Sequence, residues 1–314
     1  MQHNFARPGG VFASLLAISA LAAGCGGSGS GVATGAGAGS GAIVAVGAEN
    51  QYANVIEQIG GPYVKVSAIE RNPNTDPHSF EASPSVAQVV GAARLIVQNG
   101  VGYDTFMERI ESASPSSARR VIDVQKLLGL PESTANPHLW YKPQTMPAVA
   151  GAIVSDLSAL APAHAAYFQA AAARFKRSLT PWYQALEQFA AAYPNTPVAT
   201  TEPVGDYMLE AAGTDNLTPL GLQADIMNGV DPAPQDVTLQ NGLFSGHKVK
   251  VFVYNQQVTD SLTQSFLAAA KRAGVPVVGV YETMPSGYDY QSWMLAEVRA
   301  LRRAVAESVS TQSL

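Results

Sequence analysis

The chain has 314 residues, of which 47% are hydrophobic and 14% charged, and its formal net charge is −5. This length is enough to bury one large core or two smaller ones, and two lobes are the initial expectation. No run of Lys or Arg is long enough to attract a polyanion, so nucleic acid is not expected as a partner.

The N-terminus has the pattern of a lipoprotein signal peptide. Arg7 precedes an apolar stretch at residues 11–20, and small residues follow it up to Cys25. The stretch is shorter than the roughly 20 residues that a membrane-spanning helix needs. We expect residues 1–24 to be removed and Cys25 to carry lipid that anchors the chain to the cell membrane, outside the cytoplasm. A chance cysteine in a secretion signal is the alternative.

Cys25 is the only cysteine, so no intramolecular disulfide and no thiol site are expected in the folded part. Residues 25–42 are rich in Gly, Ser and Ala and cannot bury enough apolar surface to fold. They are predicted to be a flexible tether.

From residue 43 onward, strand-like and helix-like patterns alternate. In the predicted N-terminal lobe, residues 43–145, the strands are expected at 43–46, 64–69, 94–98 and 120–124, and the helices at 50–60, 83–93 and 103–112. Such alternation predicts a mostly parallel sheet with crossover helices.

Residues 146–193 contain no strand-like run and have Ala, Leu and aromatic residues at helical spacing. We predict a helix at 146–160 and a longer one at 163–193, which Pro181 should kink or interrupt. The longer helix has the reach to join two lobes as a rigid connector.

The alternation returns in residues 194–314, the predicted C-terminal lobe. Its strands are expected at 197–201, 248–254 and 275–281, and its helices at 204–212, 235–244, 259–273 and 288–306. The predicted fold class is therefore α/β, with two lobes, each a mostly parallel sheet flanked by helices, joined by one long helix.

Two of the five histidines, His78 and His138, each follow a proline in an irregular loop after a predicted N-terminal-lobe strand. Glu202 and Glu282 each directly follow a predicted C-terminal-lobe strand. In open α/β sheets the carboxyl ends of strands border the ligand crevice, so the four side chains converge if the lobes face each other. Each residue alone is more often structural or solvated. Together, two imidazoles and two carboxylates suit Mn²⁺, Fe²⁺ or Zn²⁺.

On these motifs, the chain resembles the metal-binding lipoproteins of zinc- and manganese-type ABC importers. Members carry an Asp-Pro-His motif and a second Pro-His followed by Leu-Trp, and the resemblance covers about residues 43–306. It implies that His78, His138, Glu202 and Glu282 are the metal ligands and that two lobes move little about one long helix. It also implies delivery of the metal to an ABC permease that has a separate ATPase subunit.

The chain departs from that family pattern in two places. The third ligand is His in zinc-type members but Glu202 here, as in manganese-type members, and the fourth is usually Asp where this chain has Glu282. Asp289 is therefore a reserve candidate. Because the His- and acid-rich loop of zinc-type members is also missing, we favour Mn²⁺ slightly over Zn²⁺; Fe²⁺ also fits the donor set.

Glu81, Trp140 and Asp206 are candidates for the layer behind the ligands, because a ligating imidazole usually donates its other N–H to an acceptor. The alternative roles are helix capping for Glu81, core packing for Trp140 and solvation at a helix turn for Asp206.

We expect a monomeric binding protein and not an enzyme. Catalytic zinc keeps an open coordination position for water, whereas four protein ligands would close it. The sequence also has no His-Glu-x-x-His helix, Gly-x-Ser-x-Gly elbow or ATP-binding glycine loop. A surface adhesion or interaction lipoprotein on the same fold is the alternative, followed by a metallo-hydrolase.

Overall fold

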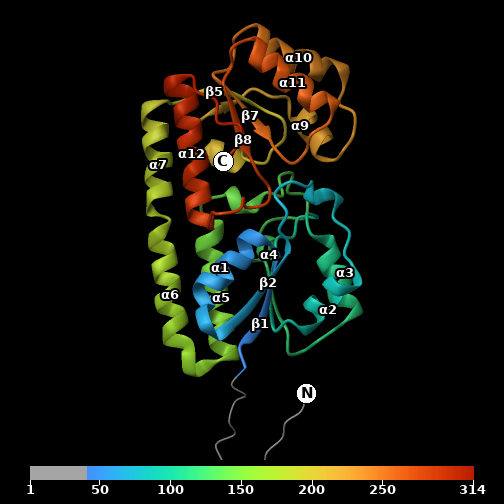
Figure 1. The fold of residues 1–314 in the computed structure, drawn as a ribbon, viewed down its shortest axis with the longest axis vertical. Coiled ribbons are helices and arrows are strands. Elements are labelled where there is room, and N and C mark those ends of the chain that lie inside the picture. The colour runs from blue at the N-terminus through green and yellow to red at the C-terminus, as the bar shows by residue number, and fades with distance from the viewer. Residues whose placement is uncertain (1–40) are drawn as a thin grey trace, which may run out of the picture. The chain divides into compact units, whose positions relative to one another are not determined.

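The computed structural model describes residues 41–314, which contain two four-stranded parallel sheets flanked by helices (Figure 1). The predicted two-lobe α/β class is confirmed. The predicted signal peptide, Cys25 and most of the predicted tether lie outside the described residues. Within residues 41–314, no helix is both long enough and apolar enough to cross a membrane.

The first sheet has the strand order β2-β1-β3-β4, and all of its neighbours are parallel. Alternate residues of its β-branched strands are buried on opposite faces, as the period of a strand requires. One face packs against α1 and α5, and the other against α2 and α3 (Figure 1). Its elements are β1 (Ile43–Glu49), α1 (Asn50–Gly60), η1 (Gly61–Tyr63), β2 (Val64–Glu70), η2 (Pro77–Ser79), α2 (Pro84–Ala92), β3 (Leu95–Gln98), α3 (Thr105–Ala113), β4 (Arg120–Asp123), α4 (Val124–Leu127) and η3 (Leu139–Tyr141).

The connector follows as α5 (Thr145–Leu160), η4 (Pro162–His164), α6 (Ala165–Ser178) and α7 (Thr180–Ala192). The predicted long helix is interrupted between α6 and α7, and Pro181 lies in the first turn of α7, where its missing N–H costs no helical hydrogen bond. α6 packs on α1 of the first lobe and α7 packs on α12 of the second (Figure 1).

The second sheet repeats the topology of the first, with the strand order β6-β5-β7-β8. Sequence patterns missed β6 and α9, because a strand of two residues has no readable period and α9 lies in a stretch rich in turn residues. The elements are β5 (Pro197–Thr200), α8 (Asp206–Ala211), β6 (Asp215–Asn216), α9 (Leu220–Met227), α10 (Pro234–Ser245), β7 (Val251–Asn255), α11 (Ser261–Arg272), β8 (Val277–Val280) and α12 (Tyr290–Glu307).

One hydrophobic core runs through both lobes and the connector. It includes Ala45 of β1, Trp140 of η3, Trp182 of α7 and Trp293 of α12, none of which is exposed. Residues 41–314 accordingly form a single compact unit, and the predicted lobe boundaries at 145 and 193 stay predictions. A shared core of this kind opposes large hinge motion between the lobes.

Candidate metal centre

The carboxyl ends of both sheets supply the candidate ligands. His78 lies in η2 after β2, and His138 directly precedes η3. Glu202 and Glu282 each follow a strand of the second sheet, β5 and β8, by two residues. The strand ends thus present two imidazoles from one lobe and two carboxylates from the other.

Three of these four side chains meet. Nε2 of His78 and Nε2 of His138 each lie 3.2 Å from Oε2 of Glu282. One candidate ligand atom from each of the three residues lies within 4.8 Å of the other two. The hydroxyl of Tyr103 donates a hydrogen bond to the same carboxylate oxygen at 3.0 Å. A cation placed among these atoms would meet nitrogen and oxygen donors from both lobes.

Both Pro-His segments are held by the residue two positions before the histidine. Oδ1 of Asp76 accepts the backbone N–H of His78 at 2.8 Å, and Oδ1 of Asn136 accepts that of His138 at 3.0 Å. Short polar side chains often close turns in this way. The intervening proline fixes its own φ, so each turn sets the position of its imidazole.

Asn136 also sets the tautomer of His138. Its amide nitrogen donates to the carbonyl of Pro203 at 2.7 Å, so its oxygen faces Nδ1 of His138, 2.8 Å away. An amide oxygen only accepts, which assigns the proton of neutral His138 to Nδ1. Nε2, which lies 3.2 Å from Oε2 of Glu282, is then the nitrogen available to bind a metal ion.

Exposure and charge distinguish the two imidazoles. The His138 side chain is fully buried, whereas that of His78 is 24% exposed. Burial lowers the pKa of His138 from its ordinary value. For His78, burial lowers the pKa but the hydrogen bond and charge of Glu282 outweigh it, so the net pKa is raised. Burial would raise the pKa of Glu282, yet the two imidazoles hold it well below its ordinary value.

Glu202 lies beside this group and not within it. The side-chain amide of Asn255 donates to both glutamates, at 3.1 Å to Oε1 of Glu202 and 2.8 Å to Oε1 of Glu282. Burial and the charge of Glu282 raise the pKa of Glu202 well above its ordinary value. Its Oε2 is buried with no hydrogen-bond partner among residues 41–314. An orphaned carboxylate oxygen at this place fits a cation that would draw it in as a fourth ligand.

The other residues singled out in the sequence have different surroundings. The Trp140 ring is buried and lies 5.4 Å from that of His138, edge to face. Asp206 accepts hydrogen bonds from the side-chain amides of Asn216 and Gln223 inside the second lobe, and these bonds do not connect it to either imidazole. Glu81 is exposed on the rim of a pocket beside His78.

The reserve residue, Asp289, is the N-cap of α12. Its carboxylate accepts the N–H and the hydroxyl of Ser292, and the backbone N–H of Asp289 donates to the Ser292 hydroxyl. This capping box engages the half-buried Asp289 at a helix end.

Sequence reasoning missed the residues that hold the ligands in place. Gln257 accepts the backbone N–H groups of Glu282 and Thr283 at 2.7 and 2.8 Å. Asn136 was detectable, because it precedes His138 by the same two positions that separate Asp76 from His78. Tyr103, Asn255 and Gln257 gave no local signal, because their partners lie far away in sequence.

A family model described as "zinc-uptake complex component A periplasmic" matches residues 46–304. Among curated proteins, no sequence matches the chain. Solved structures share the fold of this chain.

A crystal structure of ZnuA is 21% identical, with a TM-score of 0.69 over 84% of this chain and 100% of that one. The periplasmic zinc-binding protein TroA from Treponema pallidum is 17% identical, with a TM-score of 0.70 over 86% and 100%. The protein FpvC from Pseudomonas aeruginosa, in complex with Mn²⁺, is 20% identical, with a TM-score of 0.69 over 85% and 99%.

Proposed function

The chain belongs to the family of periplasmic zinc-uptake component A proteins, and from that premise we propose that it captures a divalent transition-metal ion between its two lobes. The observation that carries the proposal is the approach of His78, His138 and Glu282, whose candidate ligand atoms lie within 4.8 Å of one another. Groups from both lobes around one point are what a buried cargo site requires.

We assign the ligands to His78, His138, Glu282 and, after a local shift of its orphaned oxygen, Glu202. Two neutral imidazoles and two carboxylates neutralise a divalent cation, which offsets the cost of burying it. Nitrogen and oxygen donors without thiolate suit Mn²⁺, Zn²⁺ and Fe²⁺. Two carboxylates in the set of four favour Mn²⁺ slightly over Zn²⁺, and solved relatives named for either metal support both assignments.

The metal is cargo in this proposal and not a catalytic cofactor. The ion reaches His78 first, because its side chain is the exposed one, and then Glu282 and His138. The protein hands the ion to an ABC permease with a separate ATPase subunit. We further propose that the chain works as a monomer outside the cytoplasm, anchored through lipid on Cys25.

Calorimetric titration of the chelator-stripped protein with Mn²⁺ and with Zn²⁺ tests the proposal. We expect one tight site, lost in His138→Ala, with the relative affinities ranking the two ions. The matched control is His247→Asn, because His247 is exposed and has a positive φ that Asn tolerates. Absence of tight binding in the unmodified protein, or equal affinity in both variants, would contradict the proposal.

A further inference from the structure

The carboxyl edge of the first sheet holds two more buried acids, which the metal centre does not use. Glu49 ends β1 and Glu70 ends β2, and the two are register partners on neighbouring parallel strands. Register partners in a sheet direct their side chains to the same face. Glu49 is 1% exposed and Glu70 is 5% exposed, so both carboxyl groups are removed from bulk water.

The Glu70 carboxyl group is not satisfied, because both of its oxygens are buried and have no hydrogen-bond partner among residues 41–314. The buried Glu49 carboxyl group lies within hydrogen-bond reach of the Asp104 side chain. Asp104, which lies near both, contrasts with them because it accepts the backbone N–H groups of Asn99 at 2.6 Å and Gly100 at 2.9 Å. Buried unpaired carboxyl oxygens are costly and are seldom left without a ligand or a role.

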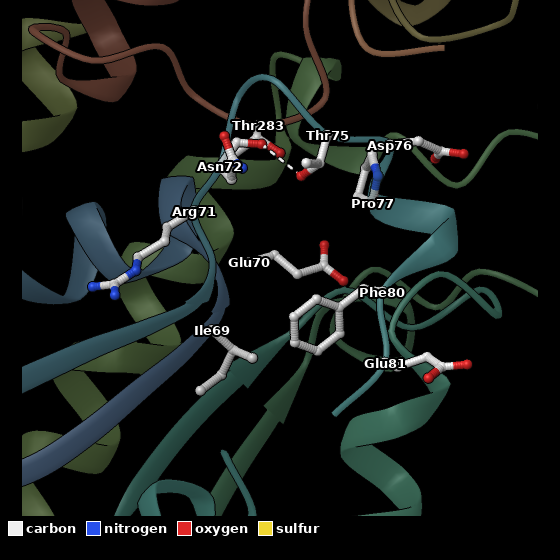
Figure 2. Close-up of a pocket in the computed structure, with 10 residues that line it drawn as sticks. All are labelled: Ile69, Glu70, Arg71, Asn72, Thr75, Asp76, Pro77, Phe80, Glu81 and Thr283. Atoms are coloured by element: carbon white, nitrogen blue, oxygen red, sulfur yellow. Dashed lines mark hydrogen bonds between the residues drawn. The ribbon is translucent and has the colours of Figure 1, made fainter. Parts of the chain in front are cut away.

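Glu70 points into a pocket of about 420 Å³ that opens beside the segment leading to His78 (Figure 2). Asn72, Thr75 and Asp76 line the same pocket, so further oxygen atoms surround the Glu70 carboxyl. Arg71 lines the pocket too, but its guanidinium extends away from Glu70 (Figure 2). The Glu70 carboxyl group therefore faces the pocket without the Arg71 guanidinium as a partner.

We propose that this pocket is a second cation site, in which Glu70 binds a hydrated divalent cation and Glu49 contributes from the neighbouring strand. Small divalent cations keep several water ligands and are held through one or two carboxylates, so a full cage of protein ligands is not needed. The donors are oxygens alone, which suits hard cations such as Mn²⁺, Mg²⁺ and Ca²⁺. The site neighbours the cargo site, because the charge of Glu282 acts on Glu70, but it does not depend on the transport role.

Glu70→Gln is a clean probe of the site. Burial, with the charges of Asp104, Glu282 and Asp76, raises the pKa of Glu70 to about 9, so its carboxyl group is neutral at pH 7 without a cation. Glutamine replaces a neutral acid by a neutral amide of the same shape and should preserve the fold. Glu108→Gln on α3 is the matched control, because Glu108 is exposed in the same lobe.

The experiment is anomalous diffraction from crystals soaked in millimolar Mn²⁺, with Mn²⁺ alone as the probe. We expect two peaks in the unmodified protein, one at the His78, His138 and Glu282 group and one within roughly 2.0–2.6 Å of a Glu70 oxygen. Glu70→Gln should lose the second peak only, His138→Ala the first only, and Glu108→Gln neither.

A single peak at the metal centre of the unmodified protein would overturn the inference, as would a pocket peak that survives in Glu70→Gln. A single peak in the pocket of the unmodified protein, with none at the metal centre, would instead overturn the proposed cargo site and support the second site. If Glu70→Gln does not fold, Glu49→Gln takes its place: reduced occupancy of the pocket peak supports the inference, and unchanged occupancy overturns it.

Discussion

The two Pro-His segments are built alike but lie in different environments. In each, the side chain two residues earlier accepts the histidine N–H, and in each Nε2 lies 3.2 Å from the same oxygen of Glu282. His138 is fully buried and its pKa is lowered, whereas His78 is partly exposed and its pKa is raised. Deeper burial therefore lowers the pKa of His138, whereas at His78 the hydrogen bond and charge of Glu282, together with the charge of Asp76, outweigh burial and raise the pKa.

The largest expected effect comes from removing the oxygen that both imidazoles share. Glu282→Gln removes the carboxylate and should weaken Mn²⁺ binding by more than roughly 100-fold. That figure is the largest loss of affinity typical of mutating a residue that hydrogen-bonds to a metal ligand. The two imidazoles should then lose the partner that shifts their pKa values. Calorimetry measures the first effect, and NMR titration of the ring protons the second. A dissociation constant within tenfold of the unmodified value would show that Glu282 is not a ligand.

The next effect is that of pH. A raised pKa means that His78 holds a proton at pH values where a free imidazole has lost it, so the metal must displace this proton. Affinity should therefore fall as pH falls from above the ordinary imidazole pKa of 6.5, by about tenfold per pH unit for each proton displaced. Binding titrations between pH 8 and 5 measure the slope. A flat profile would remove His78 from the ligand set.

A smaller loss is expected when His138 loses its orienting partner. Asn136→Ala removes the oxygen that accepts from both the backbone and Nδ1 of His138, and affinity should fall by roughly 10–100-fold. Asn136→Asp keeps an acceptor oxygen and should restore most of that loss. Equal affinities for both variants in Mn²⁺ titration would mean that the tautomer of His138 is set elsewhere.

The smallest effect is expected for Tyr103→Phe, which removes one hydrogen bond to Oε2 of Glu282. Hydrogen bonds to charged groups contribute about 1.5–3 kcal/mol, so the metal-free protein should melt at a lower temperature. The metal-bound protein should change less, because the ion itself holds that oxygen. Thermal melts with and without Mn²⁺ measure the difference; an equal shift in both states would contradict this account.

The sequence was sufficient to predict the fold class and the family, since strand ends and Pro-His motifs are local features. It predicted that His78, His138, Glu202 and Glu282 converge, because the carboxyl ends of parallel strands share an edge. The structure brings His78, His138 and Glu282 together and leaves Glu202 beside them. It did not predict the contact of Tyr103 with Glu282, which exists only after the two lobes have packed, or those of Asn255, whose partners are far from it in sequence although they lie in the same lobe. Asp289 stays a prediction as a reserve ligand. In the structure it is the N-cap of α12 and forms a capping box with Ser292, three residues later.

The hydrophobic core that runs through both lobes has a consequence for recognition. If the angle between the lobes is fixed by Trp140, Trp182 and Trp293, the loaded and empty proteins present nearly the same outline to a partner. The metal-bound and metal-free states then differ only locally, in the conformation and charge of the loop around His78. A partner that distinguishes the two states must contact that loop directly.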